Sequence, residues 1–239
     1  MTGARDGGPT PRTALLTGVS SGIGEAIGAA LLDAGWRVVG LSRTPPATAH
    51  ERLVHFPVDL SDAAALDGTL DRILTAAGPV EAVVHAAGIL RVGRIGEQTL
   101  ADGAAMWRLH VEAATQLVER LAPRLPDGGR IVLLGSRTAA GAAGRAQYAA
   151  TKAALTGLAR SWAMELAPRR ITVNVIAPGA TDTPMLRDPG RAAVAPRLPP
   201  MGRFVDPAEI AALALFLLSP GAASLTGQQI VVCGGASLL

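Results

Sequence analysis

The chain has few of the residues that build disulfide-linked, metal-binding or aromatic sites. Its single cysteine, Cys233, cannot form an internal disulfide and fits no metal-ligand spacing. Aromatic residues make up only 3% of the 239 residues. The core must therefore be built from Ala, Val, Leu and Ile, which suits helices packed on a parallel sheet. We expect a reducing, cytoplasmic setting, a thiol buried in the core and no metal site.

The sequence also lacks a long apolar run. The apolar stretch 210–218 falls well short of the roughly 18 residues that a membrane span needs. Residues 1–12 contain Gly, Pro and charge but no apolar segment typical of a signal peptide, so we expect a disordered N-terminal tail there. These absences predict no membrane association.

Positive charge is not concentrated on aromatic-rich stretches, although the net charge is +3. The only loose cluster of arginines in the sequence consists of Arg187, Arg191, Arg197 and Arg203. It lies in a proline-rich stretch with almost no aromatic side chains on which bases could stack. We therefore expect no nucleic-acid partner. The mild positive balance of this stretch favours an anionic substrate or, alternatively, reflects solvated loop arginines.

Short runs rich in Val, Ile and Leu alternate with Ala-rich stretches of helical periodicity. The expected strands are 14–16, 37–41, 53–58, 82–85, 130–134, 172–177 and 229–232. The expected helices are 23–34, 63–77, 100–121, 146–167 and 207–218. This alternation predicts one α/β domain over residues 13–239, with a seven-stranded parallel sheet covered by helices on both faces. The long connection at about 180–206 leaves a strand end, where ligands bind, and is the expected substrate loop.

A glycine-rich turn follows the first expected strand and opens the first helix. Its spacing is Gly-x3-Gly-x-Gly, in a context that lets the backbone approach a pyrophosphate at a helix N-terminus. Glycines also serve tight turns that bind nothing, but the strand-turn-helix context favours dinucleotide binding. The residues expected to contact the cofactor are Gly18, Ser20, Ser21, Gly22, Ile23 and Gly24.

The end of the second strand predicts which nicotinamide cofactor is preferred. Ser42 and Arg43 stand where an acidic residue would accept hydrogen bonds from the adenosine ribose. A guanidinium and a hydroxyl favour the 2′-phosphate of NADP(H) over NAD(H), although Arg43 can also be read as an exposed surface residue. Asp59 after the third strand is expected to accept from the adenine amino group, to cap the following helix, or both.

Tyr148 and Lys152 form the strongest candidate for acid-base chemistry. Residues i and i+4 share one face of a helix. A neighbouring ammonium favours the phenolate and so lowers the phenol pKa from its usual value of about 10. Tyr148 is the only tyrosine of the chain. The same spacing also arises by chance on ordinary helices, so the surrounding motifs decide between a catalytic pair and a coincidence.

These motifs together resemble those of the short-chain dehydrogenase/reductase family from about Thr13 onward. The matching residues are the turn at 17–24, His85 to Gly88, Ser136, Tyr148 with Lys152, Asn174, Pro178 with Gly179, and Gly227, Gly234 and Gly235. The resemblance implies a Rossmann-type doubly wound fold with strand order 3-2-1-4-5-6-7. It also implies a homodimer or homotetramer.

The resemblance implies hydride transfer between NADP(H) and a carbonyl or secondary alcohol. Ser136 would bind the substrate oxygen, Tyr148 would exchange the proton, and Lys152 would lower the phenol pKa and hold the nicotinamide ribose. Thr183 would hold the carboxamide. The remaining residues expected to contact the cofactor are Leu60, Ala86, Ala87, Gly88, Pro178, Gly179 and Thr181.

Two histidines depart from the family pattern. His110 stands where the family has its fourth catalytic residue, an asparagine, and His85 stands where another asparagine is usual. In the family the residue at the position of His110 lies in a helix irregularity, and its backbone carbonyl holds a water of the proton relay. A changed side chain there leaves this carbonyl in place, so we still expect activity. His110 is a candidate catalytic proton shuttle. The alternatives are a hydrogen bond shared with His85, or a buried neutral ring with a structural role.

Two smaller departures also concern the site. The interval from Ser136 to Tyr148 is 12 positions, one shorter than is common in the family. Ser136 stays the best candidate, and Thr138 is a weaker substitute. Cys233 stands where aspartate is usual.

The leading interpretation of function is reduction of a ketone, such as a 3-oxoacyl thioester, by NADPH. The alternatives are oxidation of a secondary alcohol, and a non-catalytic nucleotide-binding regulator of the same fold. The presence of Ser136, Tyr148 and Lys152 together counts against the regulator.

Overall fold

The computed structural model describes residues 11–76 and 78–238, so the predicted tail lies outside the described residues except for Pro11 and Arg12. Seven strands form one parallel sheet in the order β3-β2-β1-β4-β5-β6-β7, which confirms the predicted topology. The strands are β1 (Thr13–Thr17), β2 (Arg37–Ser42), β3 (Leu53–Pro57), β4 (Ala82–His85), β5 (Arg130–Leu134), β6 (Thr172–Pro178) and β7 (Gln229–Val232). Each agrees with its expected range to within one residue at either end.

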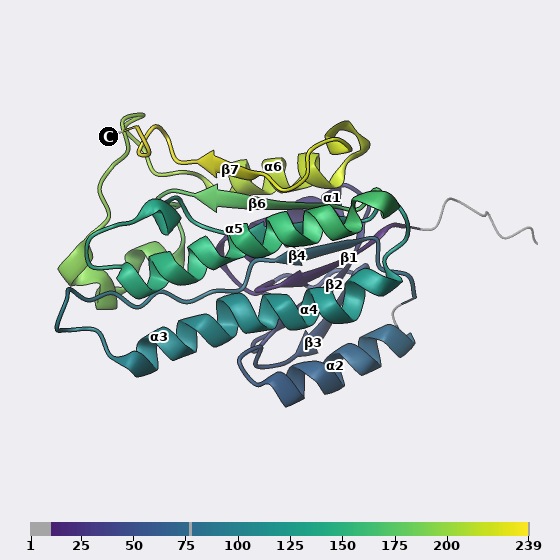
Figure 1. Ribbon diagram of the computed structural model, residues 1–239. Helices are drawn as coiled ribbons and strands as arrows, with labels where there is room; N and C mark the ends of the chain where they lie inside the picture. The colour runs from purple at the N-terminus through teal and green to yellow at the C-terminus, as the bar shows by residue number, and fades with distance from the viewer. Residues whose placement is uncertain (1–10, 77, 239) are drawn as a thin grey trace, which may run out of the picture.

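Helices cover both faces of the sheet (Figure 1). One face carries α1 (Gly22–Asp33) and α6 (Pro207–Leu218). The other carries α2 (Ala63–Ala76), α3 (Leu100–Trp107), α4 (Ala113–Leu121) and α5 (Ala146–Leu166). Among the described residues, no helix has both the length and the apolar character of a bilayer-spanning segment.

The strands are apolar throughout because side chains from both of their faces are buried. Along β1, Leu15 packs into the core beneath α2, α4 and α5, while Ala14 and Leu16 pack into the core beneath α1 and α6. All three side chains are fully buried. Alternate residues of a strand point to opposite faces, so a central parallel strand requires an unbroken apolar run.

The helix expected over 100–121 contains an irregularity that its apolar spacing did not predict. A π-helical turn, Arg108–Glu112, separates α3 from α4. Such turns insert one residue into a helix and are frequent at functional sites. His110 lies in the middle of this turn and is completely buried.

The connection from β6 to α6 contains two short 3₁₀ helices, Pro184–Arg187 and Pro189–Val194. A bridge between Thr181 and Val205 ties the two ends of this connection together. Helix α6 then begins with Asp206 as its N-cap and Glu209 completing a capping box. The expected substrate loop therefore begins and ends at defined positions beyond β6.

Candidate active site

The structure places the predicted site residues beyond the carboxyl ends of the strands and on the helices beside them. Those of the first turn lie after β1 (Gly18, Ser20, Ser21) and in the first residues of α1 (Gly22, Ile23, Gly24). Others end β2 (Ser42) or follow β2 (Arg43), β3 (Asp59, Leu60), β4 (Ala86, Ala87, Gly88) and β5 (Ser136). The others lie in the π-helical turn (His110), on α5 (Tyr148, Lys152) and at or beyond the end of β6 (Pro178, Gly179, Thr181, Thr183). This edge of an open α/β sheet is where ligands bind.

The turn after β1 is packed so closely that side chains are excluded from it. The amide of Gly18 donates to Leu41 O at 2.8 Å. Gly18 has a φ of +73°, and a Cβ there would lie 2.9 Å from the backbone of Ala87. A Cβ on Gly24 would lie 2.1 Å from Gly18 O. The first β-α turn therefore forms a cradle of bare backbone against the loop after β4, as pyrophosphate binding requires.

Glycines also bring the loop after β6 to the site. A Cβ on Gly22 would lie 3.2 Å from the Cγ2 atom of Thr183, which places Thr183 at the N-terminus of α1. A Cβ on Gly179 would lie 2.8 Å from Cys233, the buried free cysteine after β7. The small side chain of Cys233 thus lies against the Pro178-Gly179 turn.

The residues after β2 and β3 are held by hydrogen bonds among themselves. Ser42 Oγ donates to Thr44 O at 2.7 Å and lies 3.0 Å from His55 Nε2. Asp59 Oδ1 accepts from Ser61 N at 2.9 Å and from Ser61 Oγ. These bonds from Ser61 lower the pKa of Asp59, and the charge of Arg43 acts in the same direction.

Asp59 does not cap α2, so this part of the prediction is wrong. Asp62 caps the helix instead, because its Oδ1 accepts from Ala65 N at 3.0 Å. Both hydrogen bonds from Ser61 go to the Oδ1 atom of Asp59. His55 is a neighbour of the Ser42 position that the sequence did not indicate, since it reaches there only through the pairing of β2 with β3.

Tyr148 and Lys152 lie together on α5, as their spacing predicts. The Nζ atom of Lys152 is 5.8 Å from the centroid of the Tyr148 ring. It donates to Leu134 O at 2.7 Å, and Leu134 is the last residue of β5, two residues before Ser136. Ser136 Oγ lies 2.8 Å from Thr138 Oγ1, so both hydroxyl candidates lie together beyond β5.

Burial makes Lys152 an unusual lysine. Its side chain is buried, and this desolvation lowers its pKa to about 7. Lys152 is also the only lysine of the chain. An ammonium with a pKa in this range can release and regain a proton at working pH, which suits a group that supports a proton donor.

The low pKa of Lys152 predicts a pH-dependent effect of Lys152→Met on stability. The pKa is about 7 in the folded protein and about 10.4 in an unfolded chain. Between these values the unfolded state binds more protons, so the folded protein gains stability as pH rises and loses it as pH falls toward 7. We therefore expect Lys152→Met to raise Tm relative to wild type more at about pH 6 than at about pH 9, without cofactor.

The lysine pKa is measured directly by labelling lysine with ¹³C, because a single side-chain signal then titrates. A midpoint near the usual value of about 10.4, or a Tm difference independent of pH, would contradict the expectation.

The two histidines do not share a hydrogen bond, so that hypothesis is wrong. His85 Nε2 donates to Leu109 O at 3.1 Å, and His85 Nδ1 lies 2.9 Å from Thr17 Oγ1. Thr17 Oγ1 already accepts from the amides of Ala86 and Ala87, so its proton goes to His85. Burial, with the charge of Lys152, lowers the pKa of His85 to about 3. His85 is thus a neutral ring that connects β1, β4 and the π-helical turn.

His110 binds different partners. Its Nε2 lies 3.0 Å from the amide of Ile89, and its Nδ1 lies 2.9 Å from Thr151 Oγ1. Its ring stands edge-on to Tyr148, with centroids 5.6 Å apart. Thr151 is a site residue that sequence reasoning missed. Its position three residues after Tyr148 was the available signal, since i and i+3 lie near one another on a helix.

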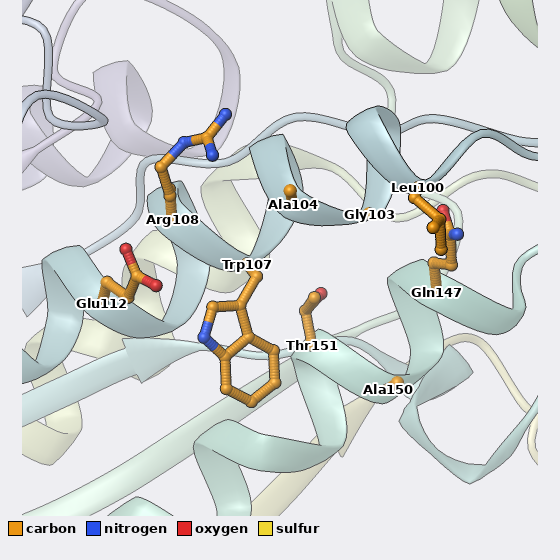
Figure 2. A pocket seen from close by; sticks show the side chains of 9 residues that line it. All are labelled: Leu100, Gly103, Ala104, Trp107, Arg108, Glu112, Gln147, Ala150 and Thr151. Atoms are coloured by element: carbon orange, nitrogen blue, oxygen red, sulfur yellow. The ribbon is translucent and has the colours of Figure 1, made fainter.

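A groove of about 340 Å³ lies between α3 and α5, behind these side chains. Figure 2 shows Trp107 of α3 beside Thr151 and Ala150 of α5. The groove does not include Ser136, Tyr148 or Lys152 among its lining residues. Thr151, the hydrogen-bond partner of His110 Nδ1, is one of the residues that line the groove.

Comparisons with known proteins identify the family of this chain. A family model described as enoyl-(acyl carrier protein) reductase matches residues 18–237. The 3-oxoacyl-[acyl-carrier-protein] reductase FabG of Vibrio harveyi is 34% identical over 240 residues, covering 94% of this chain and 96% of the relative.

Solved structures show the same fold. A short chain dehydrogenase family protein from Francisella tularensis superposes with a TM-score of 0.88 at 26% identity, covering 96% of this chain and all of that one. The 3-ketoacyl-(acyl-carrier-protein) reductase from Brucella melitensis complexed with NADH has a TM-score of 0.85 at 27% identity, covering 95% and 98%. The chain therefore belongs to the short-chain dehydrogenase/reductase family of oxidoreductases, which act on CH–OH groups.

Proposed function

We propose that this protein is an NADPH-dependent ketoreductase that uses Tyr148 as its proton donor. The observation that carries this proposal is the placement of the only tyrosine and the only lysine on one face of α5, with Lys152 tied to the end of β5. A protein that only bound nucleotide would not need a buried lysine of lowered pKa beside a phenol.

The glycine turn fits a dinucleotide because its backbone is bare where a Cβ would collide. Gly18, Gly22 and Gly24 leave room for a pyrophosphate at the N-terminus of α1, and Thr183 lies beside Gly22. The backbone of Ala86 and Ala87 lies against Gly18, and Gly88 lies beside His110 and Lys152. The bound nicotinamide supplies the hydride in reduction or accepts it in oxidation.

The protein residues manage the substrate oxygen and its proton. In reduction the hydroxyl of Ser136 donates a hydrogen bond to the carbonyl oxygen, and Tyr148 transfers its proton to that oxygen as the hydride arrives at carbon. Lys152 stabilises the phenolate that forms and holds the nicotinamide ribose. In oxidation the phenolate removes the proton of the alcohol.

The substrate class rests on the relatives rather than on loop charge. Arg187 in the substrate loop pairs with Asp182 at 2.7 Å, and Arg203 pairs with Glu209 at 2.6 Å. These pairs neutralise much of the positive balance that favours an anionic substrate. We propose a 3-oxoacyl thioester or a similar ketone because relatives over the whole length are named as 3-oxoacyl-carrier-protein reductases.

The function is tested with purified protein and a panel of 3-oxoacyl thioesters, cyclic ketones and aldoses. NADPH oxidation by wild type, absent in Tyr148→Phe, supports a ketoreductase. Turnover only of secondary alcohols with oxidised cofactor would instead favour the alcohol dehydrogenase. Tight cofactor binding without turnover in either direction would favour the regulator. The homo-oligomer expected from the family is measured by sedimentation of the same sample.

The preference for NADP(H) is a separate proposal that rests on Arg43. Arg43 is exposed and follows β2, and no carboxylate occupies the Ser42 position. We expect Arg43→Leu to weaken NADPH binding by about tenfold to a hundredfold, the effect of losing one charge-assisted phosphate contact, while NADH binding changes by less than about threefold. Fluorescence titration of both reduced cofactors measures this.

Arg94→Leu is the matched control, because Arg94 is also an exposed arginine but lies beyond β4. Equal affinity of wild type for NADH and NADPH, or equal losses for both cofactors in Arg43→Leu, would contradict the assigned role.

A further inference from the structure

The hydrogen bonds of His110 determine which of its nitrogens carries the proton. The backbone amide of Ile89 can only donate, and it points at His110 Nε2 from 3.0 Å. Nε2 is therefore unprotonated, and the ring proton lies on Nδ1. Nδ1 donates to Thr151 Oγ1 at 2.9 Å, and the Thr151 hydroxyl donates in turn to the carbonyl oxygen of Tyr148 at 2.9 Å.

A second proton on His110 would have no acceptor. It would have to sit on Nε2, where it would face the amide proton of Ile89. The charged and titratable groups around the ring are Lys152 and Tyr148 on α5 and His85 on β4. Burial, the charge of Lys152 and the proximity of His85 lower the pKa of His110 well below its usual value of about 6.5. The ring is neutral throughout the working pH range.

We propose that His110 and Thr151 form a neutral hydrogen-bonded clamp that positions Tyr148, and that His110 is a positioning residue rather than a proton shuttle. The clamp comprises Ile89 N, the His110 ring, Thr151 Oγ1 and Tyr148 O. It joins the loop after β4, the π-helical turn and the first turns of α5. The proposal rests on the proposed function only in assigning Tyr148 as the proton donor.

The clamp contacts both the side chain and the backbone of Tyr148. Thr151 lies between Tyr148 and Lys152 in sequence, and its side chain is 3% exposed. The His110 ring meets the Tyr148 ring edge-on at 86°, so it restricts the phenol as well as the backbone behind it. From the other side, His85 holds Leu109 O, the carbonyl immediately before His110. Two neutral rings thus fix the π-helical turn against β4 and α5.

Two substitutions of His110 each preserve one half of the clamp. The amide of glutamine reaches the position of Nε2, so His110→Gln keeps an acceptor for Ile89 and loses the donor to Thr151. The shorter amide of asparagine reaches the position of Nδ1, so His110→Asn keeps the donor and loses the acceptor. Thr151→Val removes the shared hydroxyl without changing the side-chain shape. Thr151→Ser keeps the hydroxyl and removes only the methyl group.

We expect Thr151→Val and His110→Gln to lower kcat about tenfold, the effect of one buried hydrogen bond lost behind the proton donor. The KM for NADPH should stay within about twofold. Thr151→Ser should keep most of the activity. The pH-rate profile should keep its shape in every variant, because no group that titrates has been removed.

A proton shuttle predicts a different pattern. Both His110 variants would then lose an ionisation from the pH-rate profile, and Thr151→Val would leave kcat unchanged. Either result overturns the clamp.

The tautomer of His110 is measured independently of activity and without a variant that has to fold. In wild-type protein labelled with ¹⁵N-histidine, the His110 ring should be neutral with its proton on Nδ1, and the His85 ring should be neutral with its proton on Nε2. Neither ring should titrate between about pH 5.5 and 8.5. A His110 signal that titrates in this range, or that carries its proton on Nε2, overturns the proposal. Absence of ketone reduction would leave this measurement intact, so failure of the proposed function and failure of the clamp are distinguishable.

Discussion

Replacing Tyr148 with phenylalanine is expected to lower kcat by about a thousandfold, within the range that general acid-base catalysis contributes. The change removes one oxygen and keeps the ring that packs against His110. Tyr148 is the only tyrosine in the chain, so no other phenol is present to take its place. Lys152 is still held by Leu134 O in the variant. The loss should therefore fall on proton transfer and not on folding.

The measurement compares kcat for ketone reduction with NADPH affinity by fluorescence. We expect the dissociation constant of NADPH to change by less than about threefold, because the cradle of glycines does not involve the phenol. Ser161→Ala is the matched control, since it removes a hydroxyl from an exposed position on the same helix. A Tyr148→Phe enzyme that keeps a tenth or more of wild-type turnover would rule out the mechanism.

Gly24→Ala should weaken NADPH binding at least about a hundredfold, an effect of about 2.7 kcal/mol or more. The new Cβ would lie 2.1 Å from Gly18 O and 2.7 Å from the Gly18 carbonyl carbon. These are backbone atoms, so no side-chain rotation relieves the contact. The turn has to move, although the amide of Gly18 anchors it to Leu41 O. Overpacking of this kind also lowers stability by about 1–3 kcal/mol.

The same substitution at Gly68 separates this local effect from the general effect of adding a methyl group. Gly68 lies exposed in α2 with nothing within 4 Å of a Cβ, so Gly68→Ala should raise stability by about 0.5–1 kcal/mol. Thermal unfolding and NADPH titration of the two variants side by side make the comparison. Normal NADPH affinity in Gly24→Ala would show that the turn does not approach the cofactor.

The strands and most helices could be predicted because their signals are local. A central parallel strand is buried on both faces, so its apolar run is continuous, as in Ala14 to Leu16. The helices α5 and α6 began and ended within one residue of their expected ends. The order of the strands came from the family resemblance, since many sheet orders satisfy the same local pattern.

The π-helical turn at Arg108–Glu112 could not be predicted from apolar spacing. Met106 before the turn and His110 and Val111 within it are buried, and a helix of ordinary period accommodates these residues as well. The turn is held by hydrogen bonds from segments distant in the sequence. His85 Nε2 donates to Leu109 O, and the amide of Ile89 donates to His110 Nε2. The family resemblance, rather than apolar spacing, indicated a helix irregularity at His110, and the structure shows that it is a π-helical turn.

By itself the sequence determined the alternation of strands and helices, the glycine turn and the face shared by Tyr148 and Lys152. Each of these follows from neighbours within one or two turns of the chain. Only the tertiary structure decided how the two histidines are protonated, which hydroxyl His110 binds and how far the pKa of Lys152 falls. The partners of His110 are 21 and 41 residues away, and the desolvation of Lys152 depends on every element packed around it. Hydrogen-bond direction and burial are properties of the folded chain, so no local pattern contains them.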